Sequence, residues 1–140
     1  MSAAAEGSPT ATRRWLAFAA VPLVGLLAFV LPSLVSPPPR EYPAPLFPWL
    51  RAAVETVGLP ALLMLVLAGA LAGTLCPLKP VPLGMYCVAL LPVAAILEIV
   101  ADPTSHSMIP FELGMYAVFG LVAAAGVAAA RWVRARWTAA

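Results

Sequence analysis

The sequence predicts an all-α integral membrane protein, an up-down bundle of four transmembrane helices. Of its 140 residues, 63% are hydrophobic and 10% are charged, whereas ordinary soluble domains have about 45–50% and about 25%. A soluble chain of this length could not cover so much apolar surface with so few charges. The apolar residues also form four long, nearly uncharged runs. At about 1.5 Å per helical residue, each run is long enough for a hydrocarbon core of roughly 30 Å.

The first predicted transmembrane helix spans residues 14–35. Residues 1–13 before it are small and polar, and we expect them to form a disordered cytoplasmic tail. A cleaved signal peptide is the alternative, because an Arg-Arg pair precedes the apolar run as it does in secretion signals. The run is longer than the apolar core of a signal peptide, and the Ser-Pro-Pro-Pro sequence from Ser36 is a poor cleavage site. A retained helix is therefore favoured.

Residues 36–48 form the predicted outer loop, and six of the sixteen prolines lie in it. Proline fixes φ and has no amide hydrogen, so we expect an extended, polyproline-like segment that cannot continue a helix. The simplest interpretation is a stiff spacer on the membrane surface, with its aromatic residues at the level of the lipid headgroups. A partner that docks on the polyproline segment is the alternative.

The second transmembrane helix is predicted over residues 49–75. Arg51 and Glu55 lie four residues apart near its outer end and therefore share one face. Toward its inner end, Gly69 and Gly73 form a GxxxG motif, which lets another helix backbone approach closely. This motif predicts helix packing without identifying the helix that packs there.

Residues 76–82 form a predicted inner turn, because three prolines in this short segment mark helix boundaries on both sides. The third transmembrane helix is predicted over residues 83–101, with a kink at Pro92. A second outer loop is expected over residues 102–109, where polar residues and prolines follow the apolar run.

The fourth transmembrane helix is predicted over residues 110–134, because a proline suits its first position and a long alanine-rich run follows. Gly120, Ala124 and Ala128 are spaced four residues apart, and we expect this small-residue stripe to meet the glycine face of the second helix. Residues 135–140 form a predicted cytoplasmic tail. Its arginine and tryptophan are typical of an anchor at a membrane surface that contains anionic lipid.

The basic residues predict the orientation. With four crossings, six of the eight basic residues lie on one side of the membrane: Arg13, Arg14, Lys79, Arg131, Arg134 and Arg136. The positive-inside rule places this side, with both termini, in the cytoplasm. Arg40, Arg51 and all the acids except Glu6 then lie outside. The richness in alanine, proline and arginine suggests a bacterial source, so we expect a multi-pass protein of the bacterial inner membrane.

The candidate functional site is a short window at the outer ends of the third and fourth helices. It contains four ionisable residues, including the only histidine of the chain: Glu98, Asp102, His106 and Glu112. Glu98 lies near the C-terminal end of its helix, where the helix dipole disfavours negative charge, so it needs a polar partner or a proton. Three roles are open: the residues bind a cation, relay a proton, or lock the loop onto the bundle. The lock asks least of the geometry.

Three of these residues also have a purely structural interpretation. Glu112 lies in the first turn of a helix, where the positive helix end favours a carboxylate by about 0.3–1 kcal/mol. Asp102 begins an Asp-Pro-Thr-Ser turn sequence, in which the aspartate accepts hydrogen bonds from the following amides. His106 orders a polar loop in this interpretation, although it is also the one side chain that changes charge near neutral pH.

The sequence indicates no cofactor. Cys76 and Cys87 form neither a CxxC pair nor a metal-ligand spacing with the histidine. His106 and Met108 suit a soft metal such as copper, but two such residues are weak support, so the metal stays unassigned. The net charge of +2 is too small for a nucleic-acid surface. The expected partners are the lipid bilayer and either a partner protein or a second copy of the chain.

These observations lead to three functional hypotheses. The first is a non-enzymatic accessory or assembly subunit that docks a partner through its outer loop and its small-residue helix faces. The second is a small oligomeric transporter, or a proton- or cation-coupled permease, that uses Glu98 as the coupling carboxylate and His106 as its gate. The third is a membrane enzyme that uses Glu98 or His106 as a general base. It ranks last because no nucleophile, cofactor motif or recognisable metal set accompanies these two residues.

In size alone, the chain resembles the small multidrug-resistance exporters and the quinone-linked disulfide-forming enzymes. The exporters require an acidic residue in the first helix, which is uncharged here. The disulfide-forming enzymes require outward-facing cysteine pairs, whereas Cys76 is expected at the cytoplasmic end and Cys87 within the third helix. Neither resemblance implies a function for this chain.

Overall fold

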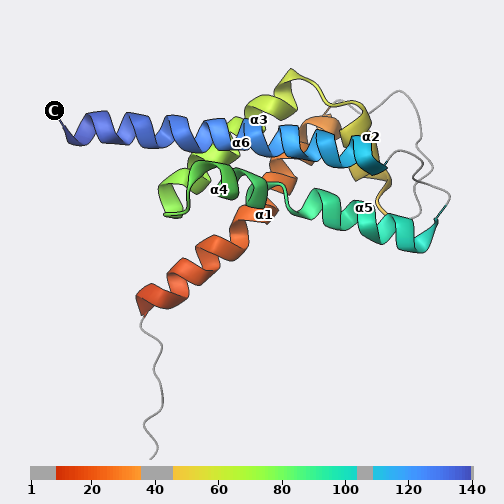
Figure 1. Ribbon diagram of the computed structural model, residues 1–140, viewed down its shortest axis with the longest axis horizontal. Helices are drawn as coiled ribbons and strands as arrows, with labels where there is room; N and C mark the ends of the chain where they lie inside the picture. Colours follow the sequence, from red (N-terminus) through yellow and green to blue (C-terminus); the bar gives the residue numbers. More distant parts are fainter. Residues whose placement is uncertain (1–8, 36–45, 104–108, 140) are drawn as a thin grey trace, which may run out of the picture.

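The computed structural model describes residues 9–35, 46–103 and 109–139, and these residues form helices and short connections without a strand. The all-helical prediction is therefore confirmed for this part of the chain (Figure 1). The helices, in chain order, are α1 (Pro9–Val35), α2 (Pro48–Glu55), α3 (Leu59–Leu75), α4 (Pro80–Cys87), α5 (Leu90–Ala101) and α6 (Ile109–Thr138).

Two of these helices, α1 and α6, are individually long and apolar enough to cross a membrane, through Trp15–Val35 and Pro110–Thr138. The pairs α2–α3 and α4–α5 reach that length only together, and they bend by 105° and 41° at their breaks. The described residues thus contain two candidate spans, or up to four if each bent pair is one span. Large apolar side chains are exposed on the helices, as expected where a helix faces lipid: Leu23, Leu27, Leu63, Leu67, Leu97 and Leu121.

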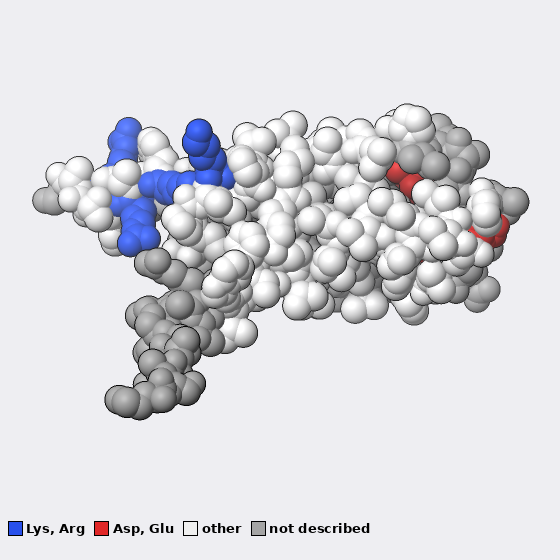
Figure 2. Space-filling view, turned by 60° about the horizontal axis from the view of Figure 1, so that its bottom comes forward, with Lys and Arg blue, Asp and Glu red and all other residues white. Residues whose placement is uncertain are grey.

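The charged residues divide between the two ends of this apolar bundle (Figure 2). We call one the carboxylate end, because it carries Glu55, Glu98 and Glu112. It consists of α2, the end of α5 and the start of α6. We call the other the arginine end, because it carries Arg131 and Arg134. It consists of the connection between α3 and α4 and the last turns of α6. The middle of the bundle is covered by uncharged side chains in the view of Figure 2.

The chain does not form one helix over residues 49–75, because it breaks between α2 and α3. Proline in a helix clashes with the carbonyl four residues earlier and has no amide hydrogen to donate. Pro60 therefore prevents the helix from continuing past Thr56, and Gly58 adopts an extended conformation at the start of α3. The acidic and basic residues of the expected outer helix end consequently lie on α2, a separate short helix.

The expected third helix over residues 83–101 is likewise broken, between α4 and α5. The break lies at Val88 and Ala89, four and three residues before Pro92. The carbonyl of Val88 is the one that the Pro92 ring would meet in a continuous helix. It accepts a hydrogen bond from the amide of Leu91 instead, at 3.0 Å. The proline thus bends the chain one turn before its own position.

The helix ends also differ from the expected boundaries. α1 begins at Pro9, so the last residues of the expected tail 1–13 are helical. Proline suits the start of a helix because its φ is already helical and its missing amide hydrogen is not needed there. α4 begins at Pro80, inside the expected turn 76–82, for the same reason. α6 continues through most of the expected tail 135–140, because no glycine or proline stops it.

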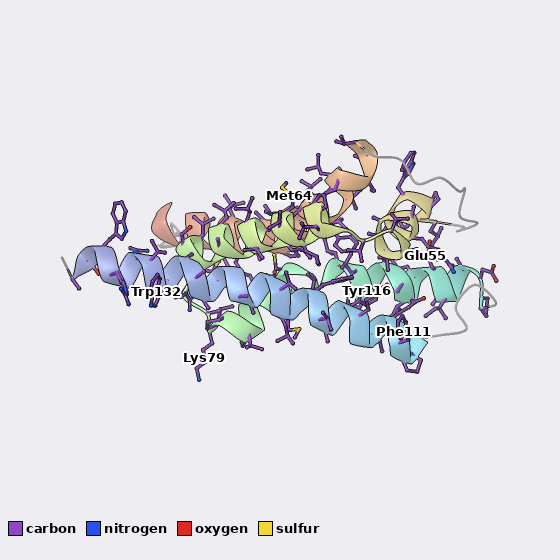
Figure 3. The ribbon with its side chains drawn as sticks, turned by 90° about the horizontal axis from the view of Figure 1, so that it is seen from above. Glu55, Met64, Lys79, Phe111, Tyr116 and Trp132 are labelled. Carbon is purple, nitrogen blue, oxygen red and sulfur yellow. The ribbon has the colours of Figure 1, made fainter. Side chains whose placement is uncertain are left out.

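The centre of the fold is the pair α3 and α6, which lie side by side (Figure 3). A Cβ at Gly69 of α3 would overlap the carbonyl of Ala123 in α6. Reciprocally, a Cβ at Gly126 of α6 would overlap the carbonyl of Val66 in α3. Both backbones are therefore closer than any larger residue permits, which is the packing expected between small residues in membrane helices.

The small-residue stripe of α6 lies elsewhere than expected. Gly120 and Ala124 face α4, where Gly84 lies against the backbone of both. The glycine face of α3 instead meets Ala123 and, through Gly73, Val127. The stripe that contacts α3 is displaced by three residues from the expected one because α6 packs between two partners, α3 and α4. All these glycines contact other helices of the same chain.

Candidate functional site

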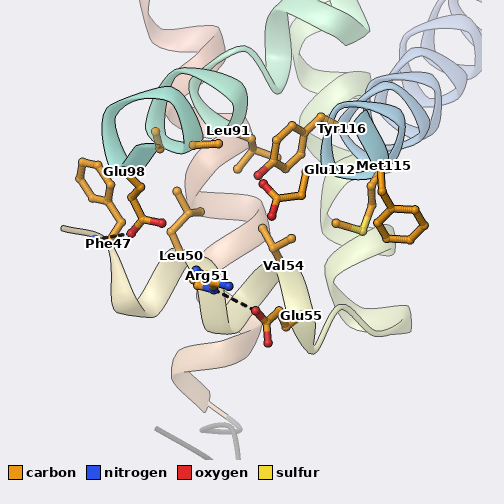
Figure 4. Close-up of a pocket in the computed structure, with 13 residues that line it drawn as sticks. Phe47, Leu50, Arg51, Val54, Glu55, Leu91, Glu98, Glu112, Met115 and Tyr116 are labelled. Carbon is orange, nitrogen blue, oxygen red and sulfur yellow. Dashed lines mark hydrogen bonds and ion pairs between the residues drawn. The ribbon is translucent and has the colours of Figure 1, made fainter. Parts of the chain in front are cut away.

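The candidate site is a cavity of about 240 Å³ at the carboxylate end of the bundle (Figure 4). Three helices line it: α2 and, from a distant part of the sequence, the consecutive helices α5 and α6. Its charged lining residues are Arg51, Glu55, Glu98 and Glu112, and its aromatic lining residues are Phe47, Phe111 and Tyr116. The cavity therefore combines three carboxylates, one guanidinium and aromatic rings.

The helix α2 forms one wall of this cavity because its two faces differ. Pro48 occupies its first turn, and Ala53 and Val54 are buried against the core. The polar face carries Arg51 and Glu55, whose Nε and Oε1 atoms lie 2.9 Å apart. Such a pair one helical turn apart and partly exposed stabilises a helix by only about 0.3–0.5 kcal/mol. Burial of the alanine and valine, more than the ion pair, therefore holds α2 on the bundle.

Glu98 is only 3% exposed, and its carboxylate has a specific partner. The amide of Phe47 donates to its Oε1 at 2.9 Å. Phe47 is the N-cap of α2, so this carboxylate lies at the positive end of that helix. The negative charge that the end of α5 disfavours is thereby accommodated by the start of another helix. This contact holds the start of α2 and not the loop 102–109, so the three roles expected for Glu98 stay predictions.

Glu112 and Tyr116 lie one turn apart on α6 and line the same cavity. In Figure 4 the carboxylate of Glu112 points toward the hydroxyl of Tyr116, above Val54 of α2. The ring of Tyr116 is buried. Glu98 and Glu112 thus line one cavity, the first from α5 and the second from α6. Tyr116 adds a polar group that the sequence analysis did not assign to the site.

Asp102, a third expected site residue, does not line the cavity. Asp102 caps the C-terminus of α5 in an extended conformation, and its amide donates to the carbonyl of Glu98 at 2.8 Å. His106 lies outside the described residues, as does Met108 of the copper hypothesis. Among the described residues, no group of three or more histidine, cysteine, aspartate or glutamate side chains is placed to hold a metal ion.

At the arginine end, as at the carboxylate end, a charged side chain forms a hydrogen bond with the backbone at the end of another helix. Nη2 of Arg131 in α6 donates to the carbonyl of Cys76 at 2.7 Å. Cys76 is the C-cap of α3, so a cation occupies the negative end of that helix. Burial raises the pKa of the Cys76 thiol, although the charge of Arg131 acts in the opposite direction. The bundle is therefore tied at both ends by charged side chains that reach the terminus of a different helix.

Sequence reasoning misses the partners in both ties. A backbone amide and a backbone carbonyl have no signature in the sequence, and Arg131 reaches a residue 55 positions earlier. Glu98 likewise reaches a residue 51 positions earlier. The available signal is the unfavourable position of Glu98 on its own helix, which predicts that some partner exists.

Comparison of the chain with protein-family models, curated proteins and solved structures finds no match. The chemistry of the cavity follows from its own residues. Carboxylates accept hydrogen bonds and attract positive charge, and aromatic faces also attract cations. The cavity thus suits a positively charged group better than an anion.

Proposed function

We propose that the protein is a four-span membrane protein of the bacterial inner membrane with both termini in the cytoplasm. The length of its helices supports this proposal. The 17 residues of α3 cover about 26 Å, and the 8 residues of α4 and 12 residues of α5 cover about 30 Å along their bent path. Both lengths are close to the thickness of a hydrocarbon core. In this up-down bundle the arginine end is cytoplasmic and the carboxylate end is outside, in agreement with the positive-inside rule. The helix α2 then lies along the outer surface.

In this arrangement the protein is an accessory subunit whose carboxylate end docks a basic segment of a partner protein. The observation that carries the proposal is the preformed cavity, which α2, α5 and α6 build together and the Glu98–Phe47 hydrogen bond supports. Among the described residues, this end carries four carboxylates and only one basic side chain, Arg51. Two copies that met through these ends would repel each other, so charge favours a different chain as the partner.

A proton- or cation-coupled permease is the second candidate, because Glu98 is a buried carboxylate in a cavity that also contains Glu112. The core below the cavity argues against it. Phe29, Leu65 and Phe119 are buried there, and the rings of the two phenylalanines lie 4.9 Å apart. Within the described part of the chain, such a close-packed apolar layer offers a proton or a cation no polar path across the bundle. Docking requires no such path.

The docking proposal predicts that a basic peptide binds at the cavity. The probe is a fluorescent pentalysine peptide, and the protein is held in nanodiscs of phosphatidylcholine. Loss of one nearby charge in Glu112→Gln is expected to weaken binding about fivefold at low salt. Asp102→Asn is the matched control, because it removes the same charge from the same end but outside the cavity. It should weaken binding far less.

Two outcomes contradict this proposal. In the first, the peptide binds equally well to the wild type, Glu112→Gln and Asp102→Asn, so the cavity contributes nothing. In the second, the purified protein is a homodimer in mild detergent and Glu112→Gln dissociates it, so the occupant is a second copy. A monomer that binds the peptide through Glu112 supports the proposal.

A further inference from the structure

A large groove of about 880 Å³ lies at the arginine end, away from the candidate site. The first described turns of α1, the connection between α3 and α4, and the last turns of α6 line it. Its apolar walls include Trp15, Phe18, Leu75 and Leu78, and Arg131 and Arg134 also line it. An apolar groove with a cationic side suits an amphiphile with a negatively charged headgroup.

The charge around this groove has one sign. The charged side chains that the structure describes at this end are all basic: Lys79, Arg131, Arg134 and Arg136. The described carboxylates lie at the opposite end of the bundle (Figure 2). An anion at the groove therefore meets no repulsion from a nearby described side chain.

The three arginines of α6 have different surroundings. Arg131 donates to the carbonyl of Cys76, which fixes its guanidinium beside the groove. Arg136 lies over the ring of Trp132, with its guanidinium carbon 4.2 Å from the ring centre, and it does not line the groove. Arg134 lines the groove and is exposed. The groove thus has one fixed arginine and one exposed arginine.

The surrounding aromatic residues place the groove at the membrane surface. Trp15, Trp132 and Trp137 are exposed around this end of the bundle, and exposed tryptophans favour the level of the lipid headgroups. The wall residue Phe18 stacks on Tyr86 of α4, with ring centres 4.3 Å apart, so that wall is held in place. The arginines therefore lie where lipid phosphates are found, and the apolar walls lie where acyl chains begin.

We propose that this groove binds one anionic phospholipid of the inner leaflet. Its phosphate lies between Arg131 and Arg134, because guanidinium groups bind phosphate oxygens through paired hydrogen bonds. One acyl chain lies against Phe18, Leu75 and Leu78. A bound lipid of this kind would join α1 to the C-terminal turns of α6.

The test is native mass spectrometry of the full chain, released from micelles that contain equal amounts of phosphatidylglycerol and phosphatidylcholine. The wild type is expected to retain one phosphatidylglycerol molecule. Arg134→Gln should retain it about fivefold less well, because one basic side chain near the phosphate is lost. Arg136→Gln is the control: it removes the same charge two residues away, and it should change retention less than twofold if the site is the groove.

A second variant tests the apolar part without changing the charge. Leu78→Trp places a larger side chain in the groove and should lower lipid retention while circular dichroism shows an unchanged helix content. Equal losses in Arg134→Gln and Arg136→Gln would overturn the proposal, since they would indicate general attraction to a basic surface. Equal retention of phosphatidylcholine, or displacement of the lipid by millimolar inorganic phosphate, would overturn it too.

Discussion

Replacing Gly69 or Gly126 by alanine is expected to destabilise the bundle by about 2–3 kcal/mol each. The reason is steric, because the new Cβ would overlap a backbone carbonyl of the facing helix: that of Ala123 for Gly69, and that of Val66 for Gly126. A backbone carbonyl cannot rotate away as a side chain can, so α3 and α6 have to separate. Alanine would otherwise favour a helix by up to about 1 kcal/mol over glycine, and this gain is too small to offset the overlap.

Gly114 supplies the control for this prediction. It lies in the same helix as Gly126, and a Cβ there would meet no atom within 4 Å. Gly114→Ala should therefore leave stability unchanged or raise it by about 0.5–1 kcal/mol. The measurement is unfolding of each variant in detergent, followed by circular dichroism. Equal stability of the Gly69, Gly126 and Gly114 variants would show that α3 and α6 are not in close contact.

Glu98→Ala is expected to release α2 from the bundle, whereas Glu98→Gln is expected to keep it in place. The alanine removes the acceptor of the Phe47 amide and leaves that amide without its partner, at a cost of about 1.5–3 kcal/mol for a charged acceptor. The glutamine side chain has the same shape and still offers an oxygen to the amide. Only the charge at the start of α2 is lost, which costs about 0.3–1 kcal/mol.

Limited trypsin digestion measures this release, because Arg51 lies in the middle of α2. Cleavage after Arg51 should be rapid in Glu98→Ala and slow in both the wild type and Glu98→Gln. The same variants separate the two functional candidates. If Glu98 only holds α2 in place, glutamine is tolerated. If Glu98 carries a proton during transport, glutamine is not tolerated, because an amide does not take up a proton near neutral pH. Proton flux in wild-type proteoliposomes that disappears in Glu98→Gln would therefore favour the permease.

The helices of the described residues and their candidate membrane spans could be predicted from the sequence, because they depend on composition and on the length of apolar runs. The two breaks are harder to predict. Pro60 and Pro92 have the same effect on a helix, yet the bend near Pro60 is 105° and the bend near Pro92 is 41°. The size of the bend depends on what the freed segment packs against, and the burial of Ala53 and Val54 holds α2 across the end of the bundle.

The candidate site could be predicted in part. Glu98 stands out because its position on α5 is unfavourable for a charge, and Glu112 follows from its nearness in the sequence. Arg51 and Glu55, in contrast, look like an ordinary exposed pair on a long helix. They line the cavity only because the chain turns back at α2. The partner of Glu98 is a backbone amide, and the sequence does not identify such a partner.

We propose that each bent pair of helices crosses the membrane once, with the carboxylate end outside and the arginine end in the cytoplasm. Labelling of single introduced cysteines by a membrane-impermeant maleimide in right-side-out vesicles tests it. The wild type serves as the control without an introduced cysteine, and little labelling is expected because Cys76 and Cys87 are buried. Burial also raises the pKa of Cys76, so its thiolate is scarce at neutral pH and it should react slowly.

Four exposed positions sample the two ends of each bent pair and the end of α6. Trp49→Cys and Pro103→Cys should be labelled in intact vesicles, whereas Leu78→Cys and Trp137→Cys should be labelled only after permeabilisation. That pattern requires one crossing by α2–α3, one by α4–α5 and one by α6. Labelling of Leu78→Cys from the same side as Trp49→Cys and Pro103→Cys would contradict the four-span topology, because the two proposed binding sites would then lie on the same side of the membrane.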